Sequence, residues 1–172
     1  SYYGEYAGSI TIPASFTYNS GIYRVISIDS WAFYNCDGLT SVDVGNNVTS
    51  IGERAFDGCD GLTSVIIGNS VVSIGVEAFY DCDVLASVTI GNNVASIGSN
   101  AFAGCKDLTS IIIPSSVISI REGAFSDCKG LTSVTIGDNV TSIGAKAFYN
   151  CIGLKSVTIP NSVVSISDSV FE

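Results

Sequence analysis

Six cysteines recur at a fixed step of 23 residues, and their thiols could form disulfides, hold a metal or react. They are Cys36, Cys59, Cys82, Cys105, Cys128 and Cys151. If successive copies stack one coil apart, neighbouring cysteines lie inside the Cα range of a disulfide, about 4.4–6.8 Å, so spacing alone leaves bridges open. No C-x-x-C pair and no histidine completes a tetrahedral metal site. We expect buried free thiols, with adjacent disulfides or a metal site as the alternatives.

Two serine columns repeat at the same step and could be read as nucleophiles. One comprises Ser41, Ser64, Ser87, Ser110, Ser133 and Ser156, and the other comprises Ser50, Ser73, Ser96, Ser119, Ser142 and Ser165. A serine nucleophile needs a positioned base, and the chain has no histidine to supply one. Asn-rich turns such as Gly45-Asn46-Asn47 lack the Asp-bearing nonapeptide of calcium β-rolls. We therefore predict no catalysis, no metal and no cofactor.

These columns belong to a repeat that fills most of the chain. The same step separates Phe33, Phe56, Phe79, Phe102, Phe125, Phe148 and Phe171, and also Leu39, Leu62, Leu85, Leu108, Leu131 and Leu154. Such periodicity is typical of a solenoid, in which each unit buries its apolar side by stacking on its neighbours. The predicted fold class is a β-rich, right-handed coil with one parallel β-sheet, short extended segments on the far wall, and short helical or 3₁₀ turns.

Within one unit, the segment 39–44 has the alternation of a strand. Val42 and Val44 should point inward and Ser41 and Asp43 outward. The copies of this segment should pair in register as a parallel sheet.

A turn, a far wall and a second turn should complete each coil. The turn after the strand contains Gly45, Gly68, Gly91, Pro114, Gly137 and Pro160. Because proline has a fixed φ and no N–H, its presence indicates that this position needs neither positive φ nor a donor. Val48 and Ile51 then predict a short extended stretch, and Ala55-Phe56 predicts a short helical turn.

The N-terminal residues depart from the repeat. Residues 16–23 contain two β-rich runs around Asn19-Ser20-Gly21, which predict a hairpin. We expect residues 1–24 to form a hairpin-like cap over the first coil and residues 25–172 to form tandem repeats. The last unit stops at Glu172, so we expect the array to continue beyond the C-terminus.

Composition argues against two classes of partner. There are 16 acidic residues against 7 basic ones, a net charge of −9. Nucleic-acid binding needs basic patches, so we predict no nucleic-acid partner. No apolar run approaches the ~18 residues of a membrane-spanning helix, so we also predict no membrane insertion.

The repeated phrase C-x-x-L-x-x-V-x-I-x-x-x-V-x-x-I-G-x-x-A-F resembles the BspA-like class of leucine-rich repeats, over about residues 25–172. This family occurs in surface proteins of bacteria and some protozoa. The resemblance implies a leucine-rich-repeat solenoid that is secreted or displayed on a cell surface. It also implies adhesion to a protein partner, such as a host extracellular-matrix protein or a protein of another cell. The family carries no motif that fixes binding residues.

We predict that a partner binds the outward face of the strands. The candidate residues are Ser41, Asp43, Ser64, Ile66, Ser87, Thr89, Ser110, Ile112, Ser133 and Thr135. Stacked repeats commonly bind through such extended surfaces. A competing surface is the variable edge that contains Glu53, Arg54, Glu77, Tyr80, Lys146 and Tyr149.

Two other functions remain open on the sequence. The array could be a structural spacer without a ligand of its own. It could also bind ice or a polysaccharide through a flat Ser/Thr ladder, although Asp43, Ile66 and Ile112 interrupt that ladder.

Overall fold

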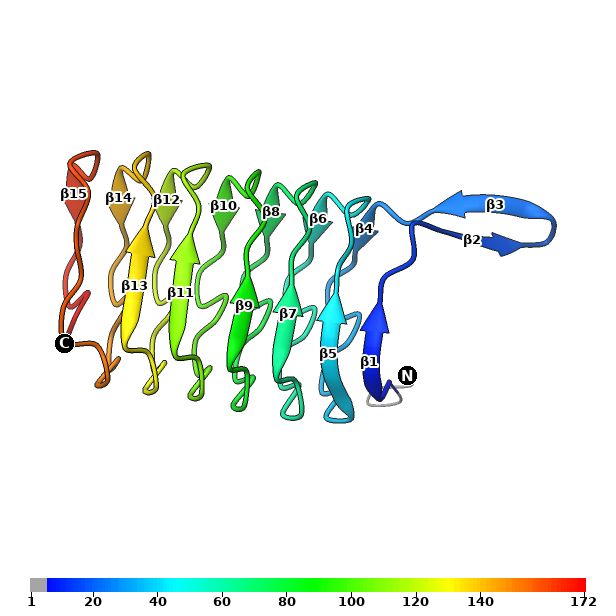
Figure 1. Cartoon of the computed structure of the whole chain (residues 1–172), viewed down its shortest axis with the longest axis horizontal. Helices are drawn as coiled ribbons and strands as arrows, with labels where there is room; N and C mark the ends of the chain where they lie inside the picture. Colours follow the sequence, from blue (N-terminus) through cyan, green and yellow to red (C-terminus); the bar gives the residue numbers. More distant parts are fainter. Residues whose placement is uncertain (1–5) are drawn as a thin grey trace.

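The computed structural model describes residues 6–172, which form a stack of coils along one long axis (Figure 1). Most coils give one strand to a first wall and a two-residue strand to a second wall. The first wall holds β1 (Gly8–Thr11), β5 (Leu39–Asp43), β7 (Ser64–Ile66), β9 (Ser87–Thr89), β11 (Ser110–Ile113) and β13 (Ser133–Ile136). The second wall holds β4 (Ser27–Ile28), β6 (Ser50–Ile51), β8 (Ser73–Ile74), β10 (Ser96–Ile97), β12 (Ser119–Ile120), β14 (Ser142–Ile143) and β15 (Ser165–Ile166).

Strand pairing within both walls is parallel, which confirms the predicted parallel solenoid. In the first wall Ser41 pairs with Ser64, and Ser64 pairs with Ser87. The second wall is a continuous sheet of seven strands, in which each serine and each isoleucine faces its copy one coil away. The constant step therefore places like side chains on top of one another, so each column of the sequence becomes a row along the molecule.

Stacked phenylalanine rings form the centre of the core. Successive rings from Phe33 to Phe171 are nearly parallel, with centroids 4.9 Å apart for the first pair and 5.7 Å for the last. The rings of Phe56, Phe79 and Phe102 are completely buried. At the N-terminal end, Tyr6 sets the edge of its ring against Phe33 at 5.1 Å. The ring stack is continuous through every coil.

The segments after the second-wall strands, such as residues 53–58, contain the predicted helical turns only as hydrogen-bonded turns, and no residue between 6 and 172 is helical. Arg54 and Gly58 have positive φ, 51° and 69°, which a right-handed helix cannot contain. The N–H groups of Arg54, Phe56 and Gly58 instead donate to carbonyl groups of the next coil at 2.8–2.9 Å. These bonds satisfy the backbone between coils, so a helix would have to break them.

The first wall is interrupted where proline replaces glycine after the strand. At Gly68, an added Cβ would lie 1.8 Å from the carbonyl oxygen of Gly45, and at Gly91 it would lie 2.4 Å from that of Gly68. Such close approach is available only to glycine. Pro114 carries a Cβ at the next position, so its coil cannot approach Gly91 this closely.

Both prolines coincide with a break in the ladder. Within residues 6–172, β9 belongs to a four-stranded sheet and β11 pairs only with β13. Before Pro160, residues 154–160 form no strand at all. This position therefore depends on the distance between coils as well as on φ and the N–H donor.

The hairpin predicted near the N-terminus is present as β2 (Ser15–Tyr18) and β3 (Gly21–Arg24). Its two-residue turn has φ of 46° at Asn19 and 65° at Ser20, as a tight type I′ turn requires. The hairpin projects beyond the first coil rather than lying across it (Figure 1), and every residue of β2 is exposed. Strand β1 instead pairs with β5 at the end of the first wall, and Tyr6 covers the ring of Phe33. The division into a cap and a repeat domain at residue 24 stays a prediction.

Candidate functional site

The cysteine column lies inside the coil, and the predicted burial is confirmed. All six cysteines are buried and free. The Sγ of Cys59 lies 3.0 Å from the carbonyl oxygen of Phe33, and Cys82 repeats this contact with Phe56 at 3.1 Å. Burial raises the pKa of the Cys59 thiol to about 12 and that of Cys151 to about 11. The thiols act as small apolar groups that donate to the neighbouring coil, and they are screened from reagents.

The first wall presents its predicted residues in two rows on its outer surface. One row consists of the serines, and the other of Asp43, Ile66, Thr89, Ile112 and Thr135. Ile66 is 51% exposed and Ile112 is 68% exposed, which are high values for isoleucine on a sheet. These two side chains are the main apolar contacts that this face offers.

Two of the ten candidate residues already form hydrogen bonds within the chain. The Asp43 carboxylate accepts a hydrogen bond of 2.9 Å from the N–H of Gly45 in its own turn. The Ser41 hydroxyl is hydrogen-bonded to the hydroxyl of Ser9 on β1. Both residues are half-buried. The open part of the face therefore extends from β7 to β13.

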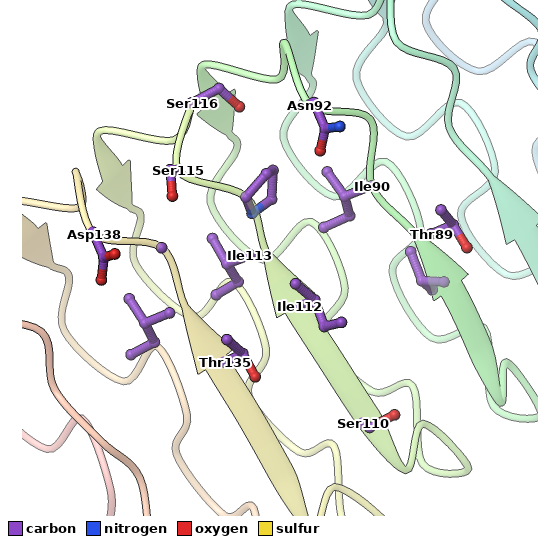
Figure 2. A pocket seen from close by; sticks show the side chains of 14 residues that line it. Thr89, Ile90, Asn92, Ser110, Ile112, Ile113, Ser115, Ser116, Thr135 and Asp138 are labelled. Atoms are coloured by element: carbon purple, nitrogen blue, oxygen red, sulfur yellow. The ribbon is translucent and has the colours of Figure 1, made fainter.

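A cavity of about 670 Å³ opens on this face across β9, β11 and β13 (Figure 2). Ile112 stands at its centre, between Thr89 on one side and Thr135 on the other (Figure 2). The remaining lining residues are Val88, Ile90, Asn92, Ser110, Ile113, Pro114, Ser115, Ser116, Ile136, Gly137 and Asp138. Because the cavity spans the break at Pro114, the same residue that separates the strands also shapes the hollow.

The cavity combines an apolar floor with hydroxyl and amide groups at its rim. Ile90, Ile113 and Ile136 are buried beneath it, while Thr89 and Thr135 are exposed. Asp138 is its only charged lining residue within the part of the chain that the structure describes. Apolar surface with a few placed polar groups is the usual character of a binding site.

The competing variable edge, which we call the turn edge, is more strongly charged than the first wall. Several of its charged side chains are already in contact with other side chains of the chain. Arg54 forms an ion pair with Glu77, and its guanidinium lies 4.8 Å from the centroid of Trp31. Lys106 pairs with Asp83 at 2.7 Å. Burial raises the pKa of Asp81, and the Asp83 carboxylate raises it further. A partner that bound here would have to compete with these contacts.

The second wall carries an exposed row that the sequence reasoning missed. The residue before each two-residue strand points outward, and we call these residues the second-wall row. The row is Ile26, Thr49, Val72, Ala95, Ile118, Thr141 and Val164, and all seven are exposed. The step of 23 residues relates these positions in the sequence, but the row mixes isoleucine, valine, threonine and alanine, so no single residue type marks it.

The family of the chain follows from its relatives. The BspA type leucine rich repeat region matches residues 13–132 and 95–172, in six copies. No curated protein matches the chain. Across residues 6–172, no helix is long and apolar enough to cross a membrane.

Solved structures share the same coil. A leucine-rich repeat protein from Bacteroides ovatus is 34% identical with a TM-score of 0.88, over 95% of this chain and 42% of its own. A leucine rich cell surface protein from Faecalibacterium prausnitzii is 35% identical with a TM-score of 0.82, over 96% of this chain and 45% of its own. The leucine-rich repeat protein of T. pallidum is 28% identical with a TM-score of 0.61, over 86% and 78%.

The chain thus spans less than half the length of the first two of these relatives. The shared repeat, the parallel walls and the sequence identity agree with one another. The protein belongs to the BspA type family of leucine-rich repeat proteins.

Proposed function

We propose that the chain is an extracellular module, displayed on a cell surface, that binds a protein through the outer face of its first wall. The cavity around Ile112 carries this proposal, because it joins exposed apolar surface to hydroxyl groups at a rigid site. The name of the F. prausnitzii relative, a leucine rich cell surface protein, supports the localisation. The partner class is a host extracellular-matrix protein or a surface protein of another cell.

The surface chemistry suits a protein more than a crystal or a sugar lattice. Asp43, Ile66 and Ile112 interrupt the hydroxyl ladder, and the break between β9 and β11 interrupts its spacing. A ligand with a regular lattice would need an unbroken row of hydroxyl groups at an even spacing. An apolar centre with adaptable hydrogen bonds around it resembles the core and rim of a protein interface. The sequence has no histidine to act as the base for a serine nucleophile, so we propose binding without catalysis.

Charge substitution on the first wall tests the proposal. The double variant Ile66→Lys with Ile112→Lys places two charges where the partner would bury apolar surface. Binding of the chain to immobilised extracellular-matrix proteins and to intact host cells should fall at least about tenfold, the equivalent of about 1.4 kcal/mol. Both side chains are exposed, so circular dichroism should show an unchanged fold.

A matched control uses exposed isoleucines away from both walls. Ile22 and Ile152 are 77% and 73% exposed, so Ile22→Lys with Ile152→Lys makes the same change of charge. This control should bind like the natural chain. Retained binding by the first-wall variant, with loss after Tyr80→Ser and Tyr149→Ser, would move the site to the turn edge. If the natural chain binds none of the matrix proteins or cells, the spacer function is favoured.

A further inference from the structure

The second-wall row has a composition that reads nearly the same from either end. Counted along the coils it runs isoleucine, threonine, valine, alanine, isoleucine, threonine, valine, from Ile26 to Val164. Large β-branched apolar residues occupy every odd coil, threonines the second and sixth, and Ala95 the middle. A row with this symmetry is complementary to itself when it is reversed.

Backbone bonds hold the row in strict register. The N–H of each member donates to the carbonyl of the member one coil earlier, as Thr49 does to Ile26 and Val72 does to Thr49, both at 2.8 Å. The series continues to Val164, with its longest bond, 3.4 Å, between Ile118 and Ala95. The second wall therefore remains continuous at the coil where the first wall breaks. Its seven strands form one rigid face.

The apolar members of the row are largely uncovered. Ile26, Val72, Ile118 and Val164 are between 50% and 85% exposed. Scattered exposed apolar residues are ordinary, but an aligned row on a flat sheet is typical of a contact surface. The two threonines also fit a buried interface, because their hydroxyls already donate to the carbonyls of Ile26 and Ile118, at 2.9 and 3.1 Å. Covering them leaves no donor unsatisfied.

We propose that the second wall is the interface of a symmetric dimer with a second, antiparallel copy of this chain. The twofold axis runs parallel to the strands and passes between the two copies of Ala95. Ile26 then faces Val164 of the partner, Val72 faces Ile118, and Thr49 faces Thr141. A twofold interface uses the same patch on both subunits, which is the condition that the row satisfies.

The size and charge of the face fit a dimer of modest affinity. Seven strands about 4.8 Å apart and a width of about five residues between the turns give roughly 500 Å² per copy, or about 1,000 Å² for the pair, the size at which specific interfaces begin. Along the rim, Asp29 faces Ser167 beside Asp168, and Glu122 faces Val76 beside Glu77, so acidic residues of the two copies approach one another. The net charge of −9 on each copy opposes association. Added salt should therefore strengthen the dimer.

Sedimentation of the whole chain over a concentration series tests the proposal. We expect a reversible monomer–dimer equilibrium that shifts toward dimer in higher salt. Val72→Lys with Ile118→Lys should weaken association at least about tenfold, because four charges would meet across the interface. Both side chains are exposed, so the fold should persist by circular dichroism. The matched control Ile66→Lys with Ile112→Lys alters the first wall and should leave the dimer unchanged.

Cross-linking tests the antiparallel register. The native cysteines are buried, so an introduced surface cysteine reacts selectively. Ala95→Cys lies on the twofold axis and should be joined to its own copy by a short bis-maleimide that spans stacked sheets, about 10 Å. Thr49→Cys should not join to its own copy, which lies about four coil steps away, but should join to Thr141→Cys in a mixture.

Several results would overturn the proposal. One is a natural chain that stays monomeric at every concentration and salt. Another is a dimer that survives Val72→Lys with Ile118→Lys, which would place the interface elsewhere, for example on the exposed aromatic residues of the β2–β3 hairpin. Equal self-cross-linking of Ala95→Cys and Thr49→Cys would show parallel copies. None of these results depends on protein binding by the first wall, so the two proposals fail separately.

Discussion

At the scale of single residues, each column of side chains is constrained by its contacts with the preceding coil. Cysteine illustrates this, because each thiol from Cys59 onward lies within hydrogen-bonding distance of a phenylalanine carbonyl of the preceding coil, from 3.0 Å at Cys59 to 3.4 Å at Cys105. A side chain without a donor would lose this bond to the preceding coil, and a larger one would not fit at a fully buried position. The column thus links packing to backbone satisfaction.

The buried thiols predict a loss of stability at alkaline pH. Burial raises the pKa of Cys59 to about 12 in the folded chain, whereas an unfolded thiol titrates near about 8.5. Protons therefore leave the unfolded chain first, so the free energy of unfolding is unaffected below about pH 8.5 and falls as the pH rises toward the folded-state pKa.

Urea unfolding at a series of pH values checks this expectation. Cys59→Ala should reduce the alkaline fall in the free energy of unfolding by up to about 1.4 kcal/mol per pH unit. The comparison with the natural chain cancels the titration of lysine and tyrosine. An equal fall in both chains would show that Cys59 does not titrate differently in the two states.

At the scale of elements, the two walls differ because of one position per coil. Glycine after the strand lets neighbouring backbones approach, as at Gly68 and Gly91, and the first wall is hydrogen-bonded there. Proline at positions 114 and 160 keeps the coils apart. The second wall has no proline in its strands and remains continuous. The first-wall cavity and the continuity of its sheet therefore depend on the same position.

Pro114→Gly should join β9 to β11 and reduce the cavity. The N–H groups of Ile90 and Thr109 should then gain partners and exchange with deuterium more slowly, while the amides of the second wall should not change. The free energy of unfolding should change little, because glycine loses about 0.4–1 kcal/mol through unfolded-state entropy while the ladder gains bonds. Unchanged exchange at Ile90 and Thr109 would show that another residue separates the strands.

Some of these features can be predicted from the sequence and others cannot, for physical reasons. The first-wall strands, the cysteine burial and the phenylalanine stack follow from spacing, because burial acts on every copy alike. The break at Pro114 did not follow, because it depends on the separation of two backbones, which a single residue type does not report. The row from Ile26 to Val164 did not follow either, because it mixes isoleucine, valine, threonine and alanine, so no single residue type marks it.

At the scale of the whole molecule, the two walls give the solenoid two separate surfaces. The first wall carries the cavity and the candidate binding residues, and the second wall carries the self-complementary row. In the antiparallel dimer both first walls stay uncovered. Two linked binding faces would strengthen attachment to a surface that displays many copies of a partner, because the second contact forms at high effective concentration.

Hydroxyl-radical footprinting of the chain, free in solution and bound to beads coated with extracellular-matrix proteins, is the most direct measurement of where a partner binds. Binding through the first wall predicts that oxidation of Ile66 and Ile112 falls on the beads, while oxidation of Tyr80 and Tyr149 stays at its free value. The opposite pattern, with Tyr80 and Tyr149 protected and Ile66 and Ile112 unchanged, would contradict the proposed site.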